Sequence, residues 1–280
     1  MSASLIARPS AEDCTPPGQQ SAVYVRLSKL PPFRPAALKL LNISVESGTA
    51  MQDFEQIFKS DPALSADLLL VANSLQFGLR ARIETIKHAL TYLGLERVRS
   101  LGCTIAFSFF VRNMPPSEYL RTVWAHSIAT AVIAEAAESP GQSQSLYTPG
   151  LMHDLGRLAL SRAVGPSYDE GLSKEFADIA EANAFEKIQF GITHCDAGAM
   201  VGAKWGFPVP LLTSLTLHHD PVVGRPGDTA DQIRMACRMA DWLGFPEVAR
   251  RDLKPPEEHP WQAGPDELRE CIVKRVAAFG

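Results

Sequence analysis

The sequence has few of the features that mark secreted or membrane proteins. It holds five cysteines in 280 residues, an odd number, and no two of them form a C-x-x-C pair. This usage indicates reduced thiols and excludes a disulfide framework. No apolar run approaches the roughly 20 residues of a membrane-spanning helix, and the opening residues, which include Glu12 and Asp13, have no secretory signal pattern. We therefore expect a cytoplasmic protein with no membrane association.

A strong excess of charge is also missing. Lys and Arg number 27 and Asp and Glu number 31, which gives a net charge of -4. The slight acidic balance argues against a dominant nucleic-acid surface, so nucleic acid is not the expected partner. The alternative, a nucleic-acid-binding regulator, would use arginines of the first half, namely Arg80, Arg82, Arg97 and Arg99. The positions of the same arginines are also explained if they lie on solvent-exposed faces of helices.

Strand patterns are the third absence. Alternation of polar and apolar residues is hardly seen, whereas apolar residues recur at spacings of three and four, as at Phe54, Ile57 and Phe58. Hydrophobic residues make up 46% of the chain, which suffices for a sizeable core. The predicted fold is all-α, a helical bundle with two lobes.

Proline, glycine and polar clusters divide the chain. Residues 1–22 are small and polar and are expected to be a disordered tail. A first helical lobe is expected over about 23–113, and consecutive prolines separate it from a second lobe at about 116–245. Residues 246–280 form an extension with a terminal amphipathic helix at about 265–278, which either packs on its own domain or pairs with another chain.

Capping residues predict three helix starts. Asp61 precedes Pro62, a cap followed by a proline in the first turn. Thr193 opens a further helix, with an acidic residue three positions later as in a capping box. Thr148 precedes Pro149 in the same way, so a central helix is predicted to begin there.

The central helix carries His153 and Asp154 side by side within an apolar run. Burial of an unpaired carboxylate is costly, so either other side chains or a metal ion must satisfy the pair. Five of the seven histidines lie between residues 126 and 219, and Asp241 lies on a further helix. Helical bundles build metal sites from such convergent donors, and a mixed His/Asp set suits iron, manganese or zinc. Arg157, one turn after the pair, could bind a phosphate in bidentate fashion.

The order of these residues resembles the HD superfamily of metal-dependent phosphohydrolases. The residues that carry this resemblance are His126, His153-Asp154 and Asp241. The surrounding sequence narrows the resemblance to the HDOD domain, an HD-related output domain, over roughly Val25 to Gly244. The motifs that resemble its first lobe are Asp61-Pro62-Ala63-Leu64-Ser65, Ala72-Asn73-Ser74 and Ala89-Leu90-x-x-Leu93-Gly94. The motifs that resemble its second lobe are Gly150-Leu151-Met152-His153-Asp154-Leu155-Gly156, Glu186 with Gly191-x-Thr193-His194-x-x-x-Gly198-Ala199, Trp205-Gly206-Phe207-Pro208 and His218-His219-Asp220-Pro221.

The resemblance implies an all-α domain whose second lobe is HD-like. HDOD domains are generally regarded as regulatory or output modules in bacterial signalling, without an established common activity. The implied ligands of one divalent ion are His126, His153, Asp154 and Asp241. A second ion, or the substrate, would contact His194, His218 and His219, and Arg157 would meet a phosphate.

The chain departs from the HD-GYP phosphodiesterases, which share the HD signature. No Gly-Tyr-Pro follows His218-His219, and Arg157 stands where those enzymes usually carry Lys. Both departures weigh against the hydrolysis of a cyclic dinucleotide.

Two functions from different classes are open on this basis. The first is a signalling protein that acts on partner proteins in trans, with a metal ion or a small ligand such as a nucleotide or phosphoester in its HD-like pocket. The alternative is a metal-dependent phosphohydrolase that uses the same ligands. Purely structural roles are open as well. His153 and Asp154 could form a hydrogen-bonded pair, and His194 and His218-His219 could lie at helix ends. Cys195 and Cys237 could occupy core positions.

Overall fold

The computed structural model describes residues 17–74, 82–138, 145–220, 228–256, 261 and 263–279. Within these ranges the chain forms the helices α1 to α15 and one isolated backbone bridge, between Phe176 and Arg250. The predicted all-α fold is confirmed. None of these helices combines the length and the apolar character that crossing a bilayer requires. Residues 1–16 of the expected tail, Arg80 and Pro221 lie outside the described residues.

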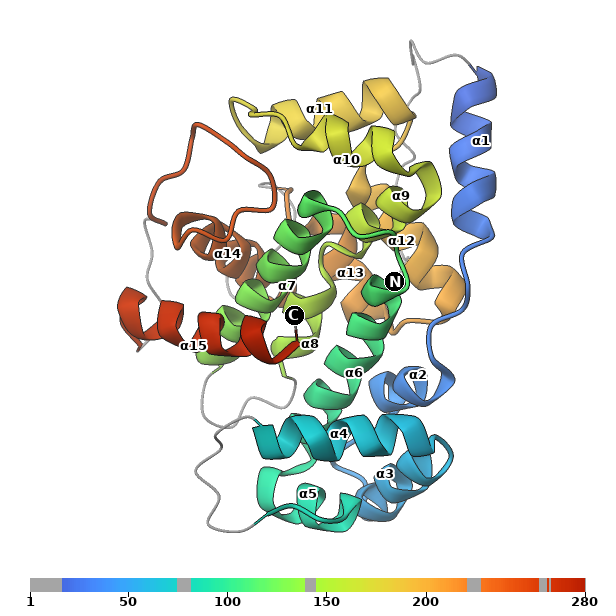
Figure 1. Cartoon of the computed structure of the whole chain (residues 1–280), viewed down its shortest axis with the longest axis vertical. Coiled ribbons are helices and arrows are strands. Elements are labelled where there is room, and N and C mark those ends of the chain that lie inside the picture. The colour runs from blue at the N-terminus through green and yellow to red at the C-terminus, as the bar shows by residue number, and fades with distance from the viewer. Residues whose placement is uncertain are drawn as a thin grey trace, which may run out of the picture.

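Figure 1 shows a lower lobe built around the beginning of α6. α6 (Leu95–Arg112) contacts the shorter helices of this lobe, and its inward face is fully buried. Large apolar side chains such as Phe54, Phe58 and Leu64 fill the space between them. The shorter helices are α2 (Pro35–Asn42), α3 (Ala50–Lys59), α4 (Pro62–Ser74) and α5 (Ile86–Leu93).

The upper lobe is arranged around α7 (Glu118–Ala136), which is buried along most of its length (Figure 1). α8 and α14 pack against α7, and α12 packs against both α9 and α13. The helices of this lobe are α8 (Tyr147–Met152), α9 (Leu155–Val164), α10 (Pro166–Leu172), α11 (Ile179–Phe190), α12 (His194–Trp205), α13 (Val209–Leu217) and α14 (Thr229–Trp242). The two lobes share one continuous hydrophobic core.

The N-terminal helix α1 (Pro17–Ser28) corrects two boundary predictions. It begins at Pro17, within the range 1–22 that was expected to be disordered, because proline suits the first helical position. It also packs on α9 and α12 of the upper lobe, although its sequence position assigned it to the first lobe. Leu27, which is fully buried, anchors the helix there.

The C-terminal helix α15 (Pro265–Phe279) matches the predicted range of about 265–278. It lies across α7, and its apolar residues Leu268, Ile272 and Phe279 are buried. The indole N–H of Trp261 donates to the carbonyl of Ile133 at 2.9 Å just before the helix begins. The terminal helix therefore packs on its own chain.

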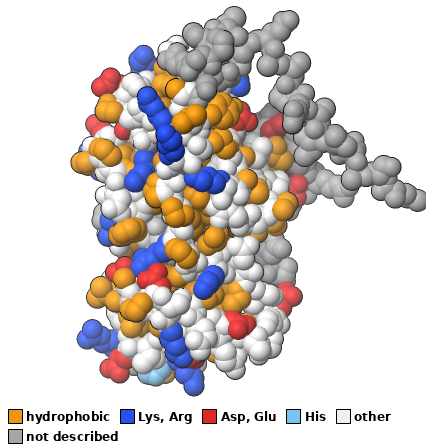
Figure 2. Space-filling model, turned by 90° about the vertical axis from the view of Figure 1, so that its right-hand side faces the viewer, with side chains coloured by type: hydrophobic (Ala, Val, Ile, Leu, Met, Phe, Trp, Pro, Cys, Tyr) orange, Lys and Arg blue, Asp and Glu red, His pale blue; other side chains and the backbone are white. Residues whose placement is uncertain are grey.

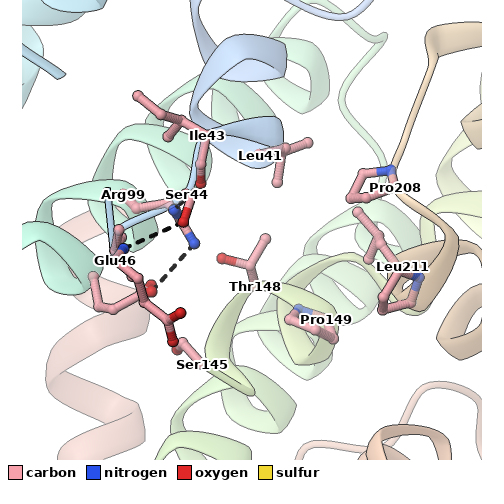
Figure 3. Close-up of a pocket in the computed structure, with 13 residues that line it drawn as sticks. Leu41, Ile43, Ser44, Glu46, Arg99, Ser145, Thr148, Pro149, Pro208 and Leu211 are labelled. Carbon is pink, nitrogen blue, oxygen red and sulfur yellow. Dashed lines mark hydrogen bonds and ion pairs between the residues drawn. The ribbon is translucent and has the colours of Figure 1, made fainter. Parts of the chain in front are cut away.

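A cavity of about 380 Å³ separates the end of α2 from the beginnings of α8 and α13 (Figure 3). It lies between the lobes, and Ile43, Thr148 and Pro208 line it. Arg99 also lines the cavity and donates to Glu96 at 3.2 Å and to the carbonyl of Ile43. Arg99, one of the arginines that the alternative nucleic-acid-binding function would use, therefore has partners within the protein.

The face that carries α1 and α2 shows Lys and Arg side chains dispersed among hydrophobic and uncharged ones (Figure 2). On the described part of this face, the basic side chains do not gather in one area. This arrangement agrees with the weak charge imbalance of the sequence.

Two of the predicted helix caps are confirmed. Asp61 Oδ1 accepts from the backbone N–H of Leu64 at 3.1 Å, and its two oxygens also accept from Arg34 at 2.5 and 2.6 Å. The hydroxyl of Thr193 accepts from the backbone N–H of Asp196 at 3.2 Å. Through its contact with Arg34, Asp61 links the start of α4 to the segment before α2.

The Asp61 cap yields a test of stability against pH. The Arg34 guanidinium holds the pKa of Asp61 below its ordinary value, so this stabilisation is present above the unfolded pKa of about 3.9 and is lost as pH falls through the lower folded pKa. We expect Asp61→Ala to cost about 1 kcal/mol at pH 7, and Asp61→Asn to cost less because it keeps a capping oxygen. Urea unfolding at pH 7 and pH 3 measures both; a difference from wild type that persists undiminished at pH 3 contradicts the assignment.

Gly156 sets how closely α9 and α12 approach. A Cβ atom at Gly156 would lie 1.7 Å from the backbone carbonyl oxygen of His194, so any larger residue forces the two helices apart. We expect Gly156→Ala to lower the free energy of unfolding by roughly 3 kcal/mol. Gly48→Ala is the control, since a Cβ atom there meets nothing within 4 Å. Equal stability of the two variants in urea unfolding would show that the helices do not meet here.

Candidate metal centre

His153 and Asp154 lie at a break between α8 and α9. The prediction of one continuous helix with Thr148 as its cap is wrong, because α8 begins at Tyr147 and ends at Met152. The His153 ring donates from Nδ1 to the carbonyl of Gly150 at 2.7 Å, which is the oxygen that a continuous helix offers to residue 154. Asp154 then precedes α9 without a capping bond, so its carboxylate is available to the interior.

Two imidazoles face each other on one side of Asp154. His126 donates from Nδ1 to the carbonyl of Phe245 at 2.7 Å, as His153 does to the carbonyl of Gly150. A carbonyl only accepts, so both Nδ1 atoms carry protons, and in their neutral form both rings present the lone pair of Nε2. These Nε2 atoms are 3.1 Å apart. Two lone pairs at this distance need a cation or a proton between them, and metal-ligating histidines are oriented in this way.

Two further imidazoles lie on the other side of Asp154. His218 Nδ1 donates to the carbonyl of Ser214 at 3.0 Å, and His194 Nδ1 donates to the carboxylate of Glu186 at 2.7 Å. The Nε2 atoms of both rings face Asp154, and that of His218 is buried without a hydrogen-bond partner. Histidines that bind a metal ion commonly donate their other ring N–H to a carboxylate, as His194 does to Glu186.

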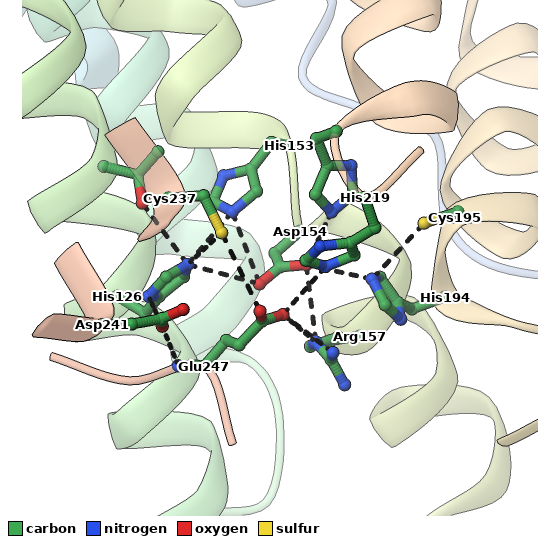
Figure 4. A network of polar contacts seen from close by, with 12 residues as sticks. His126, His153, Asp154, Arg157, His194, Cys195, His219, Cys237, Asp241 and Glu247 are labelled. Carbon is green, nitrogen blue, oxygen red and sulfur yellow. Dashed lines mark hydrogen bonds and ion pairs between the residues drawn. The ribbon is translucent and has the colours of Figure 1, made fainter. Parts of the chain in front are cut away.

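Asp154 lies between the two pairs of imidazoles (Figure 4). Its Oδ2 is 3.8 Å from His126 Nε2 and 3.6 Å from His153 Nε2. Its Oδ1 is 3.6 Å from His194 Nε2 and 3.5 Å from His218 Nε2. Both oxygens are fully buried and have no hydrogen-bond partner. The gaps are too long for hydrogen bonds, and a metal ion on each side of the carboxylate would fill them.

Burial and neighbouring charged groups together set the pKa values of the cluster. Burial lowers the pKa of His153 to about 3, so this imidazole is neutral. Burial would raise the pKa of Asp154, but His153 and Arg157 hold it well below its ordinary value. Burial would likewise lower the pKa of His194, but Cys195 and Glu186 raise it well above its ordinary value, so a metal ion at His194 would displace a proton.

The predicted ligand Asp241 lies behind His126. Its oxygens accept from the side chain of Arg250 and from the backbone N–H of Glu247, the latter at 3.1 Å. The distance from Asp241 Oδ1 to His126 is 3.4 Å and is measured to Nδ1, on the side away from the other imidazoles. Burial raises the pKa of this carboxyl to about 7. The structure therefore brings together His126, His153 and Asp154 but places Asp241 behind them.

Arg157 is fully buried beneath the cluster. Its guanidinium donates to Glu247 at 2.8 and 3.2 Å and to Glu186 at 3.1 Å, and its Nε is 3.4 Å from Asp154 Oδ1. The expected contact with a phosphate is thus replaced in this structure by contacts with protein carboxylates. Arg157 ties together the residues that position the imidazoles.

The sequence prediction missed three residues of the site: Glu186, Glu247 and Cys237. Glu247 accepts from Arg157 and lies 3.1 Å from His219 Nε2, although it falls beyond the predicted domain boundary at 245. Cys237 Sγ is 3.5 Å from His126 Nε2. The available signal for Cys237 was its position one helical turn before Asp241, on the same face of α14.

The converging donor atoms fall into three overlapping groups, within each of which they lie within 4.8 Å of one another. The groups are His126, His153 and Cys237; Asp154, His194, His218 and His219; and His219, Cys237 and Glu247. Four buried carboxyl groups surround them, those of Asp154, Glu186, Asp241 and Glu247, together with the guanidinium groups of Arg157 and Arg250. The nitrogen, carboxylate and thiol donors suit zinc or iron. The residues therefore fit a metal centre.

A pocket of about 330 Å³ opens onto this centre. His218, His219, Cys237 and Glu247 form its inner wall. Its outer wall carries the basic residues Arg234, Arg238, Arg250 and Lys254, with Asp252 among them. An anionic molecule of small size can therefore reach the donors from solvent.

Comparison with curated proteins gives an uncharacterized protein of Treponema pallidum (strain Nichols). It is 24% identical to this chain over an alignment of 208 positions, which covers 71% of this chain. The chain covers 39% of the length of that relative.

Solved structures share the fold. An HDOD domain protein of unknown function from Geobacter sulfurreducens superposes with a TM-score of 0.67 at 21% identity, over 92% of this chain and 88% of that chain. A provisionally named metal-dependent phosphohydrolase from Shewanella amazonensis SB2B superposes with a TM-score of 0.61 at 20% identity, over 94% of this chain and 100% of that chain. A provisionally named signal transduction protein from Marinobacter aquaeolei VT8 superposes with a TM-score of 0.66 at 19% identity, over 94% of this chain and 63% of that chain. At these identities the likeness shows the fold alone.

The family comparison agrees with the motifs and the fold. The model of the HDOD domain matches residues 30–221, which cover the helices from α2 to α13 and the His153-Asp154 pair. With its all-α architecture and its paired lobes, this chain belongs to the HDOD domain family.

Proposed function

We propose that this protein is a bacterial signal-transduction protein whose HD-like lobe binds two divalent metal ions and, through them, a phosphoester or nucleotide ligand. The observation that carries the proposal is the Asp154 carboxylate, whose two buried oxygens accept no hydrogen bond and each face a pair of imidazoles. Arg157 Nε lies 3.4 Å from Oδ1, and a bridging role between two ions would give both oxygens the contacts that hydrogen bonds do not supply.

The ligand sets follow from the geometry of each side. His126 and His153 hold one ion together with Asp154 Oδ2. His194 and His218 hold the other together with Asp154 Oδ1, and His219 lies within reach of it. Glu186 and the backbone carbonyls behind the rings fix their orientation, as ligand-supporting groups do in other metal sites.

The signalling role is supported by membership of the HDOD family and by the name of the Marinobacter aquaeolei structure. Partner proteins would meet the domain in trans, in the cytoplasm, as expected from the sequence. The basic outer wall of the pocket supports an anionic ligand, since Arg238 and Lys254 are exposed there.

A second candidate function is hydrolysis of the phosphoester, and the open pocket favours it. Bound metal ions would activate a water molecule and stabilise charge on a phosphoryl group. The chain's own contribution is to hold the ligands through Arg157 and Glu247 and to exclude bulk water from the buried side of the centre. The pocket wall at His218 and His219 gives a ligand access from solvent.

Metal content tests the proposal. We expect the chain, purified without added metal or chelator, to hold about two equivalents of zinc, iron or manganese. Asp154→Asn should lose most of them, because the amide supplies a single weak oxygen ligand in place of a bridging carboxylate. Asp252→Asn is the matched control, a carboxylate of the same pocket outside the converging donors. A folded, metal-free wild-type chain, or equal metal in Asp154→Asn, would exclude the centre.

Turnover separates the two candidate functions. If the chain is a hydrolase, the metal-loaded protein should cleave bis(p-nitrophenyl) phosphate, and Asp154→Asn should reduce the rate by about a hundredfold or more, because the ions supply several kcal/mol of charge stabilisation. Asp252→Asn should retain the rate. No cleavage by the metal-loaded wild type rejects catalysis on this substrate class and leaves the binding function standing.

A further inference from the structure

The pattern of the HD superfamily does not decide which residue of α14 would bind the metal ion at His126 and His153. Asp241, the carboxylate of that pattern, has both oxygens engaged by Arg250 and by the backbone N–H of Glu247. It faces His126 at Nδ1, whereas the lone pair that would bind a metal is on Nε2. Asp241 therefore orients His126 and does not reach the space in front of the ring.

Cys237 occupies that space. It lies one turn before Asp241 on α14, is almost fully buried, and its Sγ is 3.5 Å from the Nε2 of His126. Its Sγ and the Nε2 atoms of His126 and His153 all lie within 4.8 Å of one another. The neighbouring oxygen of Asp154 is buried and unpartnered and points toward the same two rings. A thiol and two imidazoles therefore converge, and a carboxylate oxygen faces the same two imidazoles.

We propose that Cys237 is a thiolate ligand of the metal ion held by His126, His153 and Asp154, in the place that Asp241 would take. This inference rests on the proposed metal centre and specifies its chemistry. A thiolate is a softer donor than a carboxylate, so this position selects zinc or iron over manganese or magnesium.

The proton of the thiol has a route to solvent. In the absence of metal, Sγ donates toward Glu247 Oε1 at 3.8 Å, and both residues line the open pocket. When the metal–sulfur bond forms, the S–H bond breaks, the electron pair stays on sulfur, and the proton leaves through the pocket to water. No change of oxidation state is involved.

Cobalt(II) provides the test, because a thiolate bound to cobalt gives an intense near-ultraviolet charge-transfer absorption, while visible bands report cobalt binding by any ligand. The full chain is freed of metal with a chelator and titrated with cobalt. We expect wild type to show both signals. Cys237→Ser should keep the visible bands, lose the charge-transfer absorption and bind cobalt about tenfold or more weakly.

Two variants serve as matched controls. Cys195 Sγ is 3.5 Å from His194 Nε2, so it is the competing thiol, and Cys195→Ser should keep the charge-transfer absorption. Asp241→Asn should also keep it, because the carboxylate lies behind His126. In competition experiments, the preference of the chain for zinc over manganese should fall in Cys237→Ser and persist in Cys195→Ser.

Several outcomes would overturn the inference. Visible cobalt bands without charge transfer in wild type would exclude a thiolate ligand and leave the metal centre intact. Loss of the absorption in Cys195→Ser, or its survival in Cys237→Ser, would assign the ligand elsewhere. A wild-type chain that binds no cobalt contradicts the metal centre and the inference together. Should Cys237→Ser fail to fold, wild type and Cys195→Ser still decide the question.

Discussion

The structure of the HD-like lobe depends on one buried carboxylate. Asp154 makes no capping bond and accepts no hydrogen bond on either oxygen, and it lies among imidazoles from α7, α12 and the end of α13. A buried carboxylate is tolerated in a protein interior only when positive charge lies close by, and the Arg157 Nε is 3.4 Å from Oδ1. The proposed metal ions would add positive charge on both sides of this carboxylate.

The residues behind the imidazoles hold this arrangement in place. Arg157 and Glu247 connect α9 to the segment after α14, and Glu186 connects α11 to His194. Gly156 allows α12 to approach close enough for His194 to reach Asp154. Each ring is thus fixed from behind, so the Nε2 atoms face one another across a small space. Such a network keeps its geometry because every member has at least one charged or backbone partner.

Much of the fold and of the donor set could be predicted from the sequence, because the signals are local. Caps such as Asp61 and Thr193 depend on neighbouring residues, and the His153-Asp154 pair stands out because ionisable groups are rare in apolar helices. Other features depend on contacts between distant segments. The packing of α1 on the upper lobe and the entry of Glu247 into the site follow from tertiary contacts that spacing along the chain does not encode. The sequence predicts a core position for Cys237, because a buried thiol and a thiol among metal-binding donors look alike in sequence.

The proposed metal centre has one cation on each side of Asp154. Anomalous diffraction from crystals of the full chain, recorded at the zinc and iron absorption edges, tests this proposal. We expect two anomalous peaks, one next to His126 and His153 and one next to His194 and His218, with an Asp154 oxygen bound to each. A well-ordered site without such peaks, in which protonated imidazoles hydrogen-bond to Asp154, would contradict it.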